Sequence, residues 1–378
     1  MQIRKIIFIP LLFIAFLGEV KGQTFQDFAS FYKNPFDVET GKLNFRIESM
    51  GFFQNNEYLG KFVDGYTLPG AMIRPKLTYS PIDGLYLETG ANVIKYSGRD
   101  QLQNLVPWFS LRYRLSEKFS VVTGNLDQNN EHGLSEQLWE PERIYIDKPE
   151  SGLQFLYNSK KLTAQTWVNW EQFIQKNDSF QEHLTFGLTG DYQLFKNPVL
   201  SVNLPVQVLL YHQGGEININ PDGPRQKMQT HSNYSAGWKM AINAGGRVKI
   251  VNLNGYWFGY KAVTKDSNTL PFDKGHAYLI ETSAQTKNSQ ISLSYWNAFQ
   301  FIAPKGRLLY QSVSDSDPSY TQTDRSFVSA KCFLQKRITK NARIAFQLES
   351  FLDVPTGDLS YSYGFFVLLN SDFLLKRF

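Results

Sequence analysis

The stretch that decides the fold is Ser326–Leu352, SFVSAKCFLQKRITKNARIAFQLESFL. It has the pattern of two β-strands joined by a short polar turn, because apolar residues alternate with polar or charged ones in both arms. Successive residues of a strand point to opposite faces, so the alternation places apolar side chains on one face and charged ones on the other. Each arm has about ten residues, the length that a tilted strand needs to cross a membrane. A hairpin of a soluble β-sandwich alternates in the same way, so the rest of the chain has to decide.

Strand-like segments follow one another from Gly41 onward with hardly any helical periodicity. The expected strands are 42–54, 66–79, 84–96, 104–114, 117–125, 150–159, 162–173, 181–194, 199–212, 232–246, 248–262, 276–286, 289–302, 326–338, 341–352 and 358–370. The links after odd-numbered strands are mostly long, whereas those after even-numbered strands are tight and contain turn residues such as Asp83-Gly84. Transmembrane barrels have this asymmetry, with short periplasmic turns and long external loops. We therefore predict an all-β transmembrane antiparallel β-barrel of about sixteen strands, with fourteen as the alternative.

The N-terminus has the pattern of an export signal. Arg4 and Lys5 precede the apolar run Ile6–Leu17, and Val20-Lys21-Gly22 offers a cleavage site. We expect residues 1–22 to be a signal peptide, 23–40 a lead-in and 41–378 the barrel. The single cysteine, Cys332, excludes an internal disulfide framework. The formal net charge of +5 is too small to indicate a nucleic-acid partner.

Aromatic residues and prolines add detail to this prediction. The chain has 30 Phe, 20 Tyr and 7 Trp, more than a soluble core of this size needs. Many of them lie near strand ends, where aromatic girdles meet lipid headgroups. The predicted girdle residues are Tyr79, Trp108, Tyr113, Trp167, Trp170, Tyr192, Tyr211, Trp257 and Trp296. Three prolines fall inside expected strands, Pro75, Pro107 and Pro205, and each should lie at a strand end or bulge because it lacks the N–H of the ladder.

This architecture resembles the porin-type outer-membrane β-barrels of Bacteroidota. The short motifs that carry the resemblance are Thr67-Leu68-Pro69-Gly70, followed by an alternating strand and Gly90, and Asn130-Glu131-His132-Gly133-Leu134. The terminal Phe378 resembles the recognition signal at the end of such barrels, although Lys376 and Arg377 interrupt the alternation before it. The resemblance implies the bacterial outer membrane and passive uptake of small solutes.

The strand faces opposite the apolar wall carry the residues expected inside the barrel. The predicted pore-lining residues are Arg74, Lys76, Glu88, Asn92, Arg112, Arg114, Lys239, Lys331, Gln335, Arg343 and Glu349. Cations outnumber anions in this set, which favours anions in a pore. We therefore predict a passive channel for small hydrophilic solutes with a mild anion preference. The alternative is that these residues pair with one another in a non-conducting barrel, a structural or docking subunit of an outer-membrane complex.

The link Leu126–Pro149 is the candidate for a loop that folds in and constricts the pore. Its acidic residues and histidine would face basic wall residues such as Arg112 and Arg114, selecting solutes by charge and size. The predicted constriction residues are Asp127, Glu131, His132, Glu136, Glu140 and Glu142. The apolar residues Leu134, Leu138 and Trp139 would anchor the loop. An ordinary solvated external loop is the alternative.

No catalytic, cofactor or metal motif stands out. The five histidines are scattered and have no metal-ligand spacing, and no nucleophile-elbow sequence occurs. Some outer-membrane barrels hydrolyse lipids with a His and a Ser on the outer wall, and His212 with Ser201 is the pair left open for that role. We expect no enzyme and no cofactor. The expected partners are outer-membrane lipids and lipopolysaccharide, small hydrophilic solutes, and a homotrimer or membrane-complex partner, with no nucleic acid.

Overall fold

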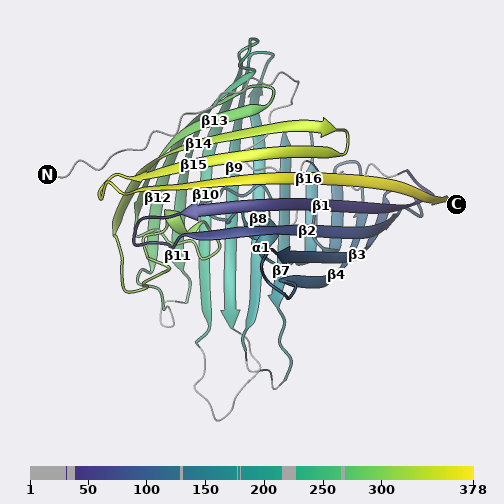
Figure 1. Cartoon of the computed structure of the whole chain (residues 1–378), viewed down its shortest axis with the longest axis horizontal. Coiled ribbons are helices and arrows are strands. Elements are labelled where there is room, and N and C mark those ends of the chain that lie inside the picture. Colours follow the sequence, from purple (N-terminus) through teal and green to yellow (C-terminus); the bar gives the residue numbers. More distant parts are fainter. Residues whose placement is uncertain are drawn as a thin grey trace.

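The computed structural model describes Phe31 and residues 39–127, 131–176, 178, 180–214, 227–264 and 269–378, in which sixteen antiparallel strands close into one barrel (Figure 1). Each strand pairs with the next in chain order, and β16 returns to pair with β1. The strands are β1 (Lys42–Glu57), β2 (Tyr66–Tyr79), β3 (Leu85–Tyr96), β4 (Asn104–Arg114), β5 (Phe119–Asn125), β6 (Ser151–Asn158), β7 (Leu162–Gln172), β8 (Glu182–Lys196), β9 (Leu200–Gly214), β10 (Gln229–Asn243), β11 (Ile250–Ala262), β12 (Lys274–Gln285), β13 (Ser289–Phe299), β14 (Asp324–Thr339), β15 (Ala342–Asp353) and β16 (Leu359–Arg377).

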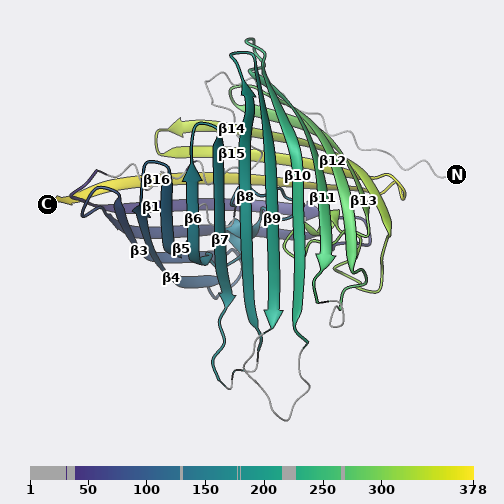
Figure 2. The same cartoon turned by 180° about the vertical axis from the view of Figure 1, so that it is seen from behind.

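The sixteen-strand all-β barrel is confirmed, and the fourteen-strand alternative is excluded. Strands on the near side cross those on the far side steeply, as tilted barrel strands do (Figures 1 and 2). The predicted signal peptide, 1–22, lies outside the described residues, as does most of the lead-in 23–40. No helix of the described chain is long and apolar enough to cross a membrane.

The alternation of the opening stretch becomes an apolar outer wall and a polar interior. In β14, Ala330 and Leu334 are exposed on the outside, whereas Ser329 and Lys331 are buried on the inside. The β14–β15 register places Lys331 directly opposite Glu349, so the two charged faces of the hairpin meet inside the barrel. Burying charges in the interior requires that they pair.

The three prolines lie where the hydrogen-bonded ladder is interrupted. The β2–β3 pairing skips Pro75, the β9–β10 pairing skips Pro205, and the β4–β5 pairing begins only at Ser110, after Pro107. A proline therefore costs no ladder bond on that side. Gly90 pairs with Lys76, the residue after Pro75, and an added Cβ at Gly90 would be 2.1 Å from the Pro75 carbonyl oxygen.

The last strand is longer than predicted, because it continues past residue 370 to Arg377. Its end pairs with β1 through a bulge at Leu375, since Lys376 and Leu374 pair with consecutive residues of β1. A bulge shifts the alternation by one residue, which explains why the pattern breaks there. The N–H of Phe378 then donates to the Gly41 carbonyl at 2.8 Å and closes the seam.

Two links fold into the barrel, and we call their described residues, 126–127, 131–150 and 300–323, the plug. The β5–β6 link carries helix α1 (Arg143–Ile146), which lies within the barrel in Figure 1, and the β13–β14 link carries the 3-10 helix η4 (Leu308–Tyr310). The links bind each other, because the N–H of Glu140 donates to the Lys305 carbonyl at 2.8 Å. Buried apolar residues of the plug include Leu138, Trp139, Ile144, Tyr145, Phe301, Ile302 and Tyr310.

Part of the predicted aromatic girdle lies inside the barrel instead. Trp108, Trp167 and Trp296 are at most 3% exposed, and Trp296 packs edge-on against Tyr310 of the plug with ring centres 5.2 Å apart. Trp170 and Trp257 do face outward, with 46% and 39% of their surface exposed. Tyr211 also points inward, where Lys305 Nζ of the plug lies 4.1 Å from the centre of its ring. Nearness to a strand end does not determine which face a side chain takes, so the girdle prediction was wrong for these four residues.

Candidate functional site

The predicted pore-lining residues lie on the inner faces of their strands. Arg74, Lys76, Glu88, Asn92 and Arg112 are buried along β2, β3 and β4. Lys239, Lys331, Gln335, Arg343 and Glu349 occupy inward positions of β10, β14 and β15. Arg114 differs, because it ends β4 and binds Asp83 of the β2–β3 turn at 2.6 Å. Whether these residues line an open pore stays a prediction.

The charges on the inner face of β1–β4 compensate one another. Arg112 lies within ion-pair distance of two carboxylates, one on the wall and one on the plug. Arg46 and Glu48 were missed, although the alternation in Asn44–Ser49 places both on the same face as Lys76. The ion pairs are Arg46–Asp372 (3.3 Å), Arg46–Glu88 (3.7 Å), Lys76–Glu48 (2.8 Å), Lys76–Glu88 (3.5 Å), Arg112–Glu88 (3.9 Å) and Arg112–Asp127 (3.6 Å). The predicted excess of cations is therefore absent from this network.

A second network joins the plug to the wall. Arg307 donates from Nη1 to Glu136 Oε2 at 2.9 Å within the plug, and from Nη2 to Glu349 Oε2 on β15 at 2.6 Å. Lys331 of β14 pairs with Glu349 Oε1 at 3.0 Å and also donates to Glu136. Burial disfavours the ionised form of Glu136, but Lys331 and Arg307 outweigh it and lower the pKa of that carboxyl. Two cations and two carboxylates thus form a neutral, buried cluster.

The remaining predicted constriction residues also belong to the loop that lies inside the barrel. Glu142 accepts hydrogen bonds from Asn56 Nδ2 and from the Tyr66 hydroxyl, both at 2.9 Å. Burial raises the pKa of Glu140 to about 8. Glu131 is half-buried at the start of the loop. The structure places this loop inside the barrel, and its role as a solute filter stays a prediction.

His132 is packed as a structural residue of the plug. Its Nε2 lies 2.6 Å from Glu150 Oε2, and its ring stacks on Trp167 with centres 3.9 Å apart. Gln165 brackets it, donating to the His132 carbonyl at 2.8 Å and facing Nδ1 at 3.2 Å. The side chain has no exposed surface, and within the described chain no hydroxyl group hydrogen-bonds to the ring. His132 therefore lacks both a nucleophile and access to a lipid.

The predicted lipid-facing pair, His212 and Ser201, is not brought together. Both lie in β9, eleven residues apart, which is about 36 Å at ~3.3 Å per residue. An odd separation also puts them on opposite faces of the strand. This pair cannot act on one substrate, so that interpretation was wrong.

His212 instead meets a hydroxyl on the neighbouring strand. The β9–β10 register pairs it directly with Thr230, and His212 Nδ1 lies 2.9 Å from Thr230 Oγ1. Both residues share the outer face with Val206 and Val208, since their spacing from these is even. They lie at the end of the barrel that carries the long links, which faces outward from the cell in barrels of this kind.

A carboxylate lies nearby on the third strand. Glu182 of β8 pairs with Gly214, two residues beyond His212, so it is a diagonal neighbour of His212 on the outer face. Its Oε1 accepts a hydrogen bond from Trp170 Nε1 at 3.3 Å. We call Glu182, His212 and Thr230 the outer-rim group; β8, β9 and β10 lie side by side in Figure 2. Sequence reasoning missed Thr230 because only the strand register places it beside His212.

Solved outer-membrane barrels share this fold. A loop L8 deletion mutant of OmpT, an outer membrane protein of Vibrio cholerae, has a TM-score of 0.52 at 10% identity, covering 88% of this chain and all of that one. OprB of Pseudomonas putida has a TM-score of 0.52 at 10% identity, covering 88% of this chain and 94% of that one. OprD of Pseudomonas aeruginosa has a TM-score of 0.51 at 6% identity, covering 90% of this chain and 97% of that one. Such low identities show the fold alone, and this protein is an outer-membrane barrel. No curated protein matches the chain.

A family model described as lipid A 3′-O-deacylase-type matches residues 34–378. The match spans every strand of the barrel. Because that description names an enzymatic activity, our expectation that the chain is not an enzyme is wrong. The sequence carries no local signature of the activity, since the candidate groups come from separate strands.

Proposed function

Because this chain belongs to the lipid A 3′-O-deacylase-type family, we propose that it hydrolyses the ester that links a fatty acyl chain to the sugar of lipid A. Such an ester lies in the membrane, between the apolar chains and the sugar, so the hydrolytic group has to face lipid near the membrane surface. The hydrogen bond between His212 and Thr230, on the outer wall at the end of the long links, is the observation that carries the proposal.

The outer-rim group has the parts of an activated nucleophile. His212 takes the proton of the Thr230 hydroxyl while Oγ1 attacks the ester carbonyl carbon. The sugar oxygen leaves with that proton, and the acyl chain remains on Thr230. Water, deprotonated by His212, then attacks the acyl carbon. The bond from that carbon to Thr230 Oγ1 breaks, the fatty acid leaves, and His212 returns the proton to Oγ1. Glu182, the diagonal neighbour of His212 on β8, is placed as a positioning residue for the imidazole ring.

The passive channel predicted from the sequence has weaker support. Sixteen strands enclose enough space for a pore. However, the plug occupies the interior with buried side chains, and the wall cations Lys76, Arg112 and Lys331 are paired with carboxylates. We keep the anion-leaning channel as a second hypothesis. Steady ohmic steps with an anion-leaning reversal potential in a planar bilayer would support it, and silence from folded protein would favour a plugged barrel, including a docking subunit.

The deacylase proposal is tested by fatty-acid release from lipid A in mixed vesicles containing the refolded protein, followed by mass spectrometry. Thr230→Val keeps the side-chain shape but removes the hydroxyl, and His212→Ala removes the base. We expect each to lower the rate by about 10²-fold or more, the usual contribution of a positioned base.

His276→Ala is the matched control. It removes another outward-facing histidine from the same end of the barrel, on β12, away from the outer-rim group. The His276 ring stacks on Phe299 with ring centres 5.6 Å apart. We expect it to retain the wild-type rate. A wild-type protein that releases no fatty acid refutes the function, whereas full activity in both outer-rim variants refutes only this site.

A further inference from the structure

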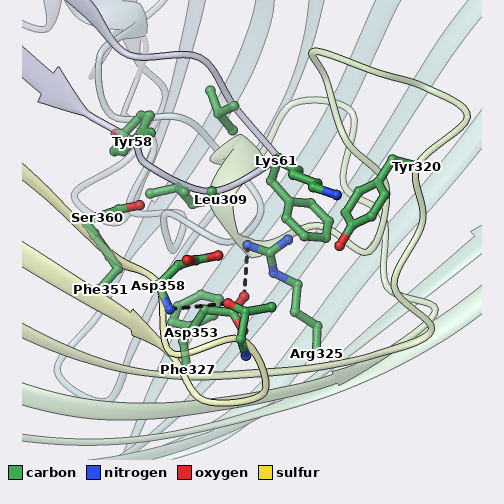
Figure 3. Close-up of a pocket in the computed structure, with 14 residues that line it drawn as sticks. Tyr58, Lys61, Leu309, Tyr320, Arg325, Phe327, Phe351, Asp353, Asp358 and Ser360 are labelled. Carbon is green, nitrogen blue, oxygen red and sulfur yellow. Dashed lines mark hydrogen bonds and ion pairs between the residues drawn. The ribbon is translucent and has the colours of Figure 1, made fainter. Parts of the chain in front are cut away.

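A cavity of about 180 Å³ lies at the outer mouth of the barrel, between the β1–β2 link, the plug and the ends of β14, β15 and β16 (Figure 3). The buried rings of Phe62, Phe327 and Phe351 form its apolar lining. Exposed Lys61 and Asp358 stand at its edge. Neither the outer-rim group nor the predicted pore-lining residues contribute to it.

Arg325 is the polar side chain of this cavity whose donors are least satisfied. It is 4% exposed, and its guanidinium carbon lies 3.2 Å from the centre of the Phe62 ring. Its Nη2 is 3.9 Å from Asp353 Oδ2, which is too far for a hydrogen bond. Its Nε and Nη1 have no hydrogen-bond partner among the residues that the structure describes. Leaving such buried donors unmet is costly, and an acceptor from outside the described residues would relieve that cost.

We propose that this cavity binds a single sugar ring that carries a phosphate or carboxylate group. The planar fork of a guanidinium matches those two anions, which accept two parallel hydrogen bonds. The aromatic rings offer flat apolar surfaces to the C–H face of a sugar. Asp353 and Asp358 line the same cavity and accept hydrogen bonds from sugar hydroxyls.

The size of the cavity and the charges around it restrict the class of ligand further. A volume of about 180 Å³ accommodates a single sugar ring. Lys61 supplies a second cation at the edge, with its Nζ 5.2 Å from the centre of the Tyr320 ring. The site does not depend on the proposed deacylase, because it lies inside the mouth at β14–β16, whereas the outer-rim group lies on the outer wall at β8–β10.

Isothermal titration of the refolded full chain with glucose 1-phosphate, glucuronate and neutral glucose tests the proposal. We expect saturable binding of the two anionic sugars and at least 10-fold weaker binding of glucose, since a hydrogen bond to a charged group is worth about one decade or more. Arg325→Met should weaken binding at least 10-fold, and Arg325→Lys should recover part of it. Lys274→Gln, at an exposed position on the outer end of β12, is the control and should bind as wild type.

The source of the sugar is resolved by competition. Displacement of glucose 1-phosphate by lipopolysaccharide vesicles, but not by phospholipid vesicles, identifies a lipid headgroup; no displacement by either identifies a free solute. Lys61→Gln, at the exposed edge, serves if Arg325→Met does not fold, and it should weaken binding of both anionic sugars because it removes the second cation. Absence of saturable binding by either sugar, or equal affinity in wild type and the folded variant, overturns the proposal.

Discussion

Replacing Arg307 with Met tests whether charge holds the plug in the barrel. Methionine keeps much of the length but removes the bonds to Glu136 and Glu349, at 2.9 and 2.6 Å. Both carboxylates then stay buried with Lys331 alone, so the cluster changes from neutral to one unpaired negative charge. Removing one partner from a buried ion pair costs about 3–5 kcal/mol. That is a large share of the roughly 5–15 kcal/mol that stabilises a typical protein.

Two measurements on the refolded protein detect this cost. If the plug stays in place, the free energy of unfolding in guanidinium chloride should fall by about 3–5 kcal/mol. If the plug leaves the barrel instead, planar-bilayer conductance should rise while the wall keeps most of its stability. The double variant Arg307→Met/Glu349→Gln restores neutrality between Lys331 and Glu136, so it should be more stable than Arg307→Met by about 0.5–3 kcal/mol.

Arg247→Met is the matched control for these measurements, because Arg247 is exposed in the β10–β11 turn. It should be neutral in both assays. The idea that this cluster holds the plug would be refuted if Arg307→Met changed neither property. Its free energy of unfolding would then lie within about 0.5 kcal/mol of the wild-type value, the range of ordinary surface substitutions, and its conductance would be unchanged.

Two further predictions concern protonation and packing inside the barrel. Burial raises the pKa of Glu140 to about 8, above the ordinary 4.5, so the folded state retains a proton that the unfolded state loses between these values. The stability that this group contributes should therefore be full below about pH 4.5 and fall as the pH rises to about 8. Glu140→Gln should flatten that part of the profile when the guanidinium chloride midpoint of unfolding is plotted against pH. Equal slopes in the wild type and the variant would contradict this prediction. An added Cβ at Gly187 would lie 2.1 Å from the Trp167 ring. Gly187→Ala should therefore lower the free energy of unfolding by about 1–3 kcal/mol. Gly190→Ala is the control and should be neutral, because an added Cβ there meets open space.

The register between strands was beyond prediction from the sequence. His212 was correctly placed on the outer wall, but the predicted Ser201 proved to lie on the opposite face of the same strand. Its real partner, Thr230, is on β10, across a link that has no recognisable pattern. A slip of one residue in pairing turns every side chain to the other face, and only the assembled barrel specifies that pairing.

The plug shows a similar division. The composition of 126–149 indicated a loop with acidic residues and apolar anchors, and that loop does lie in the barrel. The second inserted link, 300–323, gave no comparable signal. Arg307 reaches Glu136 and Glu349 at separations of 171 and 42 residues, and the sequence contains no indication of which distant charges will meet.

The sequence by itself determined an outer-membrane barrel with an apolar wall and a charged interior. The reason is local: period-two alternation assigns each residue to a face, and alternating link lengths orient the barrel. The tertiary structure alone decided which interior charges pair, that two links fill the lumen, and which hydroxyl lies beside His212. Those outcomes depend on contacts between strands and links far apart in the chain, where strand register and the burial of charge select one arrangement.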